Sequence, residues 1–225
     1  MTYREIINEV LRRLREDQIE SDWSGNLSTA SGPTDYQKMI GDFVNDAKYE
    51  VEHYWDWQTL RVTAAINTVA DTMSYSLVGS GSDFRVLDVV DTTTGLLLKQ
   101  VASSALNKKA FPVSSQATGQ ASEYGFNGID ANLDTVVDLW PKPNDVRQIN
   151  FNIVKPQDKL QTATTSLYVN PQAVILGTYV RALSERGEDG GTQVSVAAAE
   201  FQNVLSRAIE IDAGKTQYET DWYAN

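Results

Sequence analysis

Residues 2–17 read TYREIINEVLRRLRED, and this stretch decides the fold class at one end of the chain. Thr2 followed by Glu5 is a capping-box pattern, in which each side chain satisfies a backbone N–H at the start of a helix. From Tyr3, apolar side chains recur at i, i+3, i+4, i+7, i+8 and i+11, which is one stripe of a 3.6-residue helix. The stretch therefore predicts an amphipathic helix whose apolar stripe is buried against other elements.

A second amphipathic helix follows a polar loop at 21–33 (SDWSGNLSTASGP). Thr34 or Asp35 caps it, and it continues to the aromatic cluster at 54–57 (YWDW). Gly41 within it lowers its helix propensity slightly. The predicted buried stripe consists of Tyr36, Ile40, Phe43, Val44, Ala47, Val51 and Tyr54, and Asp42, Asp46 and Glu52 are expected to face away from it.

The middle of the chain changes to short β-favouring runs. These runs lie at 60–69, 72–78, 84–91, 95–101, 135–140 and 147–154. The GSGS sequence at 79–82 predicts a turn, and the loop at 92–95 (TTTG) closes a predicted hairpin. Residues 102–121 are expected to hold either a short helix or a loop.

Two further helices are predicted near the other end. Asn170 followed by Pro171 is a cap residue with proline at the first helical position, and the glycine-rich stretch 187–191 separates this helix from one at about 192–213. A short link makes the two an antiparallel hairpin. The sequence therefore predicts an α+β fold in which helices from both ends form a bundle around an inserted antiparallel β-rich region. The expected division is a helical pair at 1–58, the β-rich insertion at 59–168, a helical hairpin at 169–214 that packs on 1–58, and an extended tail at 215–225.

Composition narrows the class of protein. The chain has 225 residues, 41% of them hydrophobic, and no cysteine, so it can bury a core but forms no disulfide or thiolate site. It begins without a signal-peptide pattern and has no apolar run of membrane-spanning length, so we expect it to fold in the cytoplasm of the cell that makes it. A net charge of −11 argues against a dedicated nucleic-acid binder. That charge keeps a protein soluble, and it also suits a wall past which DNA slides without binding.

Candidate catalytic and metal-binding residues are few. His53 is the only histidine, and a lone histidine is more often a packing or surface residue than a ligand. Residues 130–134 (DANLD) resemble the opening of a calcium loop, but Thr135 and Pro141 stand where glycine and glutamate are required. No phosphate-binding or nucleophile motif is present. We therefore expect no cofactor, no metal and no catalytic residue.

Exposed aromatic side chains are the remaining candidates for binding. Trp55 and Trp57 form either a sugar or peptide platform or, more commonly at the end of an amphipathic helix, the cap of a core. The tail aromatics Tyr218, Trp222 and Tyr223 must be buried against their own chain or against a partner.

Several segments, taken in order, resemble the head-to-tail adaptor proteins of tailed bacteriophages, including the tail tubular protein A type. These segments are 3–16 (YREIINEVLRRLRE), 36–47 (YQKMIGDFVNDA), 51–57 (VEHYWDW), 139–143 (LWPKP), the helix that begins at Asn170-Pro171, and the final helix containing 199–201 (AEF). The resemblance covers most of the chain, and it is weakest in the middle.

The resemblance implies a structural protein of the virion neck, assembled in the host cytoplasm. Adaptors of this family form a ring, usually of twelve copies, beneath the portal, where they extend the DNA channel and offer a platform to the next tail or nozzle protein. DNA would pass without sequence-specific binding, and no membrane would be involved. Because the C-terminal segment often reaches the portal in related proteins, Tyr218, Trp222 and Tyr223 become candidates for portal docking.

The arginines Arg12, Arg13 and Arg15 are candidates for the subunit interface of such a ring, where they would meet a neighbour's acidic face. The alternative is that they complement the negative end of their own helix dipole. Two other functions stay open at this point. One is a virion protein that degrades the cell wall, and the other is a sugar- or peptide-binding module built on the β-rich region.

Overall fold

The chain folds into two compact units, each with its own core. The computed structural model describes residues 1–110, 117–187 and 192–215. Residues Met1–Leu60 and Gln157–Asn225 make up the helical unit, and Arg61–Pro156 make up the β unit. This combination of helices with antiparallel and mixed sheets confirms the predicted α+β class.

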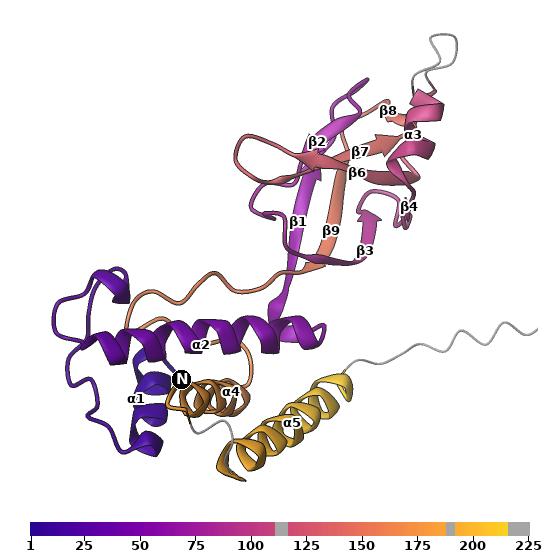
Figure 1. Ribbon diagram of the computed structural model, residues 1–225. Helices are drawn as coiled ribbons and strands as arrows, with labels where there is room; N and C mark the ends of the chain where they lie inside the picture. Colours follow the sequence, from indigo (N-terminus) through magenta and orange to yellow (C-terminus); the bar gives the residue numbers. More distant parts are fainter. Residues whose placement is uncertain (111–116, 188–191, 216–225) are drawn as a thin grey trace, which may run out of the picture. The chain divides into compact units, whose positions relative to one another are not determined.

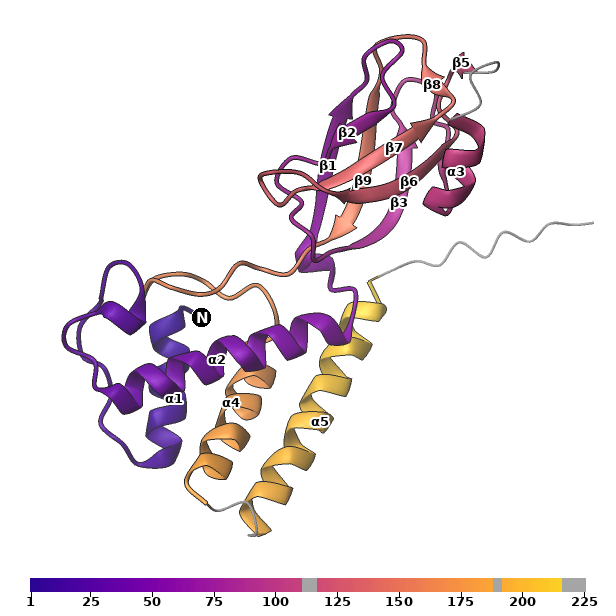
Figure 2. The same ribbon diagram turned by 45° about the horizontal axis from the view of Figure 1, so that its top comes forward.

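Four α-helices build the described part of the helical unit. They are α1 (Tyr3–Leu14), α2 (Asp35–Tyr54), α4 (Pro171–Glu185) and α5 (Thr192–Ala213), with short 3-10 turns η1 (Leu27–Thr29) and η2 (Gln58–Leu60). Helix α4 packs against α1, α2 and α5, so it is the centre of the bundle (Figures 1 and 2). The helical unit is therefore built from residues that precede the β unit in the sequence and residues that follow it.

The helix ends follow the sequence signals. At α1 the backbone N–H of Thr2 donates to Glu5 Oε2 over 2.8 Å, and the N–H of Glu5 donates back to Thr2 Oγ1, which completes the predicted capping box. Helix α1 ends because Arg15 adopts the left-handed conformation, with φ at 59°. Helix α4 starts where Asn170 accepts hydrogen bonds from two N–H groups of the first turn, with proline next to it.

Helix α2 is the element on which the predicted faces were partly wrong. Glu52, expected to face solvent, is only 1% exposed, and Tyr54, expected to be buried, is 50% exposed. Tyr36 and Phe43 are half buried. The reason is that the chain returning from the β unit covers the Glu52 side of α2, where the N–H of Gln157 donates to Glu52 Oε1. A helical pattern gives the direction of the apolar stripe but not which polar side chains a distant segment will cover.

That returning segment depends on polar side chains of α2 for its hydrogen bonds. Asn45 accepts from the N–H of Leu160 over 2.8 Å and donates to the carbonyl of Leu160 over 3.2 Å and to the hydroxyl of Tyr3 over 3.1 Å. One turn further on, Lys48 donates to the carbonyl of Gln157. Asn45 is 7% exposed and Leu160 is 1% exposed, so water does not satisfy the backbone groups of Leu160.

Gly41 has a packing role that explains a weak helix former within α2. A Cβ at this position would lie 2.2 Å from Leu27 Cδ2 and 2.7 Å from the hydroxyl of Tyr3. Glycine therefore lets η1 and the start of α1 approach the backbone of α2 more closely than alanine would.

The described residues of the β unit, 61–110 and 117–156, contain nine strands and one helix. The strands are β1 (Arg61–Asn67), β2 (Ser74–Ser76), β3 (Arg85–Asp91), β4 (Lys99–Gln100), β5 (Thr118–Gly119), β6 (Glu123–Ile129), β7 (Thr135–Trp140), β8 (Lys142–Pro143) and β9 (Gln148–Val154), and the helix is α3 (Ser103–Ala110). They form a three-stranded sheet of order β1-β9-β3, a four-stranded sheet of order β2-β7-β6-β4, and the pair β5-β8. The inward side chains of the two larger sheets share one core, to which β9 contributes Ile149, Phe151 and Ile153.

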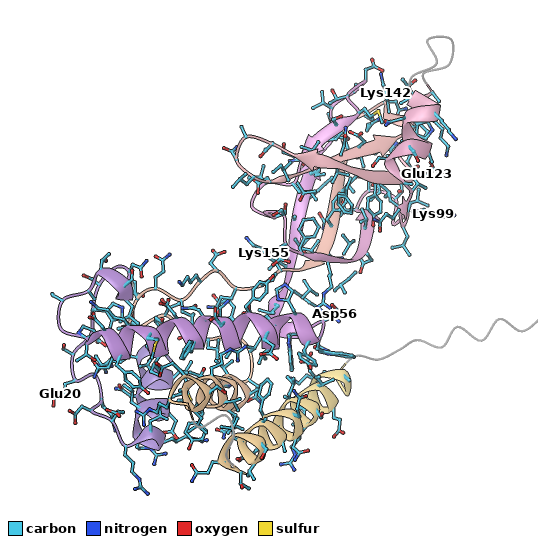
Figure 3. The ribbon with its side chains drawn as sticks, viewed as in Figure 1. Glu20, Asp56, Lys99, Glu123, Lys142 and Lys155 are labelled. Carbon is cyan, nitrogen blue, oxygen red and sulfur yellow. The ribbon has the colours of Figure 1, made fainter. Side chains whose placement is uncertain are left out.

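Strand β6 was missing from the sequence prediction. It contains Gly125 and Gly128, which lower β propensity and hide its alternation. Gly125 is required by packing, since a Cβ there would lie 2.6 Å from Leu106 Cδ1 of α3. Glu123 at the start of β6, which is labelled in Figure 3, also pairs with Lys109 at the end of α3. Helix α3 occupies part of the stretch for which helix and loop were both open, and 111–116 lie outside the described residues.

Replacement of Asn45 by leucine is expected to destabilise the helical unit by about 2–4 kcal/mol, because both backbone groups of Leu160 would then be buried without a partner. Urea unfolding followed by circular dichroism measures the change. The control is Asn203→Leu on α5, an exposed position where the same replacement is expected to change stability by less than about 0.5 kcal/mol. Equal stability of the two variants would contradict the role given to Asn45.

Candidate assembly surfaces

The described residues contain no group of three His, Cys, Asp or Glu side chains placed to hold a metal ion. His53 is exposed on the last turn of α2, where its ring stacks on that of Tyr49 with centroids 4.0 Å apart. Its Nδ1 lies 2.8 Å from the carbonyl oxygen of Tyr49. This is a surface stacking arrangement on one helix.

The calcium-like stretch forms a polar turn. Asp130 Oδ1 accepts from the N–H groups of Asn132 and Asp134, and a hydrogen bond from Ser76 is the largest of the causes that lower the pKa of Asp130. The carboxylate of Asp134 accepts from the N–H groups of Gly79 and Gly81. Asp130 thus braces the turn that precedes β7, and Asp134 braces the turn that follows β2.

A buried acidic side chain would support the interpretation that the chain is an enzyme. Glu52 is the clearest case. Burial is the main cause that raises its pKa, the signature of a carboxyl that acts as a general acid. Its oxygens, however, accept from Lys48 Nζ over 2.9 Å and from the N–H of Gln157, and the side chain is enclosed. Glu52 therefore fastens the returning segment to α2, and substrate has no path to it.

Burial also separates the two roles considered for the tryptophans, a ligand platform and the cap of a core. Trp57 is 4% exposed and its Nε1 donates to the carbonyl of Val51 over 2.8 Å, so it caps the helical core. Trp55 is half buried at the end of α2. Trp23, from the loop after α1, is 7% exposed, donates to the carbonyl of Gln161 and packs edge-on against Tyr3. These indoles stabilise the bundle, and they do not present a flat ring pair to a ligand.

The three arginines at the end of α1 have different environments. Arg12 pairs with Glu9 over 2.6 Å, which raises the pKa of Arg12 and lowers that of Glu9, and Arg13 pairs with the same carboxylate over 3.4 Å. Arg15 is exposed, and its guanidinium has no ion-pair partner among the described residues. Only Arg15 of the three is fully available to another molecule.

A groove of about 620 Å³ opens beside Arg13 and Arg15. The ends of α1 and α4 and the first half of α5 line it, with Arg13, Leu14, Arg15, Tyr179, Leu183, Arg186, Thr192, Gln193, Val196, Ala197 and Glu200. Arg186 was not singled out from the sequence. It pairs with Glu16, donates to the hydroxyl of Tyr36 over 2.9 Å, and has its guanidinium carbon 5.2 Å above the centre of that ring. We call this hollow the arginine groove.

The portal-docking candidates Tyr218, Trp222 and Tyr223 lie outside the described residues. The last described residue, Lys215, lines a smaller hollow of about 280 Å³ together with Trp57, Tyr168 and Ile211. Tyr168 and Ile211 are 58% and 59% exposed, so an apolar surface lies where the tail leaves α5.

The charge of the chain is concentrated in the helical unit. The sequence of that unit carries 21 Asp and Glu against 11 Lys and Arg, whereas the β unit carries nine against eight. Across the described residues, no helix is long and apolar enough to cross a membrane. The helical unit therefore presents an acidic surface in which the arginine groove is a local exception.

Comparison with known protein families gives one match. The family model described as SU10 adaptor protein matches residues 1–223, which include both units. No curated protein matches the chain.

The buried pair of Lys48 and Glu52 predicts how the stability of the fold depends on pH. Because the folded-state pKa of Glu52 is raised above its unfolded value of 4.5, its contribution to stability is present below that pH and is lost as the pH rises through the folded pKa. Subtracting the stability of Glu52→Gln from that of the wild type is expected to leave a term that falls as the pH rises from 4.5 to 7.5. Urea unfolding at several pH values measures it. A difference that grows with pH would show that Lys48 outweighs burial.

Proposed function

This chain belongs to the SU10 adaptor protein family, a family of phage head-to-tail adaptors, and we propose that it forms a ring below the portal that extends the DNA channel and offers the tail its attachment platform. Family membership makes it a structural component of the phage virion. The observation that carries the proposal is the extent of the match, which runs through both units and does not stop at one of them.

A ring requires two different flanks on each subunit that fit each other head to tail and close. The helical unit supports this requirement, because Asn45 and the Lys48–Glu52 pair fix the returning segment to the helices. A rigid body of this kind can offer an interface of standard size, about 800 Å² on each partner. The proposed stoichiometry is twelve, as is usual for adaptors of this kind.

The acidic helical unit supports passage of DNA without binding. The 21 acidic side chains of that unit against 11 basic ones favour repulsion of phosphate, so a channel wall built from it would release the genome during ejection. We propose assembly in the host cytoplasm and no catalytic role. Glu52, the buried carboxyl with the raised pKa, is held by Lys48 and Gln157, which supports a purely structural function.

The tail is proposed to dock on the portal through Tyr218, Trp222 and Tyr223. Aromatic side chains of this type bring a large apolar area to an interface and dominate binding energy. The tail follows α5 in the sequence, so its attachment point is the end of that helix. The downstream tail or nozzle protein is the proposed partner on the other side of the ring.

Electron microscopy of the protein mixed with its portal tests the ring. We expect the protein alone to be a monomer or small oligomer and the mixture to show ring density below the portal. The control is the portal alone, imaged under the same conditions. Absence of added density in the mixture would refute the ring.

Truncation before Gln217 tests the tail. The shortened chain is expected to unfold at the same urea concentration as the full chain, because the tail begins after the last residue of α5. Its attachment to the portal, measured by co-sedimentation, is expected to weaken at least tenfold, which is about 1.4 kcal/mol. A full-length chain with Tyr218→Ser, Trp222→Ser and Tyr223→Ser separates loss of the aromatic side chains from loss of length. Unfolding of the truncated chain, or unchanged attachment, would contradict the docking role.

A further inference from the structure

The outer face of α2 carries an acidic and aromatic stripe. Asp42, Asp46, Tyr49 and His53 stand at i, i+4, i+7 and i+11, so they lie along one line of the helix, and all four are exposed. Tyr49 is 56% exposed, and its ring contacts the ring of His53 at a tilt of 38°. We call these four residues the α2 stripe. An exposed tyrosine of this kind brings a large apolar area to an interface.

The acidic groups of the α2 stripe are available to a partner. Within the part of the chain that the structure describes, the carboxylate of Asp46 has no ion-pair or hydrogen-bond partner. Asp42 pairs with Lys159 over 3.1 Å, but both side chains are more than half exposed, so the pair is weak. The stripe therefore joins a tyrosine to a free carboxylate three residues before it.

The arginine groove offers the opposite chemistry. Arg15 lines it with a guanidinium that has no ion-pair partner in the described structure, and Val196 is an exposed apolar side chain of the lining. Val196 is 59% exposed although it belongs to the groove, so an apolar side chain from outside could cover it. A cation beside an exposed aliphatic surface is the complement of the α2 stripe.

The two surfaces lie far apart on one copy. Arg186 in the groove contacts Tyr36, which is in the first turn of α2, and Tyr49 follows thirteen residues later, a rise of about 20 Å along a helix. A subunit cannot bring its own α2 stripe to its own groove. Two different surfaces that fit each other on separate copies make a heterologous contact, the kind that closes into rings.

We propose that neighbouring copies of this chain join through these two surfaces, with Tyr49 of one copy packed against Val196 of the next and Asp46 facing Arg15. The inference rests on the proposed ring function, since it names the surfaces from which the ring is built. It assigns the subunit contact to Arg15 and leaves Arg12 to its own Glu9.

Charge reversal tests the proposed contact. Arg15→Glu and Asp46→Lys alone are each expected to raise at least tenfold the concentration of chain needed to half-saturate the ring on the portal. The double variant, which restores opposite charges across the contact, is expected to return to within threefold of wild type. Electron microscopy and sedimentation with the portal provide the readout, and circular dichroism checks that each variant is folded.

Matched controls change the same charges outside the contact. Arg12→Glu alters the same helix end but lies outside the groove, and Glu20→Lys alters an exposed acid in the loop between α1 and α2 (Figure 3). Both are expected to form rings as the wild type does. If the wild type forms rings that neither Arg15→Glu nor Asp46→Lys weakens, or if the double variant is not rescued, the surfaces are wrong while the ring function stands. If the wild type forms no ring on the portal, the proposed function fails, and the inference fails with it.

Disulfide cross-linking tests the contact independently. Because the chain has no cysteine, any disulfide must form between the introduced residues. Tyr49→Cys and Val196→Cys variants, mixed on the portal under mild oxidation, are expected to form a disulfide-linked pair of chains. Tyr49→Cys mixed with Val78→Cys, an exposed position in the β unit, is the control and is expected to form none. Equal cross-linking in both mixtures, or none in the first while rings form, would overturn the proposed contact.

Discussion

The structure depends on hydrogen bonds that the returning chain finds on α2. After the β unit, the backbone near Gln157 and Leu160 runs across a helix whose surface there is closed to water, and it needs partners for its N–H and carbonyl groups. Asn45, Lys48 and Glu52, placed one turn apart, supply them. Without these side chains the segment would have to stay solvated, and α4 would have no fixed approach to α1 and α2.

This constraint separates the inside of the helical unit from the surfaces that remain for other molecules. Helix α4 is enclosed by three helices, whereas α5 packs mainly on α4 and keeps much of its surface open. The polar side of α2 is divided in the same way. Glu52 and Lys48 are covered by the returning segment, and Asp46 and Tyr49 stay exposed. A solvent-facing residue on α2 is therefore one that no described segment of the same chain covers.

The sequence predicted what local physics determines. The capping box of α1, the cap and proline of α4 and the alternation of β9 act within a few residues, and each was found where expected. Contacts between distant segments escaped prediction. Glu52 looked solvated because its cover arrives about a hundred residues later, β6 was hidden by two glycines, and Arg186 reaches the arginine groove only after α4 has packed. For the candidate site, the sequence indicated a basic end of α1. It did not show which of the arginines lacks an ion-pair partner among the described residues.

The strength of the proposed contact bears on when a ring would form. An exposed pair such as Asp46 with Arg15 contributes at most about 1 kcal/mol, and one partly buried tyrosine adds about 1–2 kcal/mol. Two copies in solution would then separate readily, since association itself costs several kcal/mol in lost freedom. A template that holds many copies side by side removes most of that cost, because each further contact becomes intramolecular. A weak head-to-tail contact between free copies thus suits a subunit that closes its ring on the portal and not before.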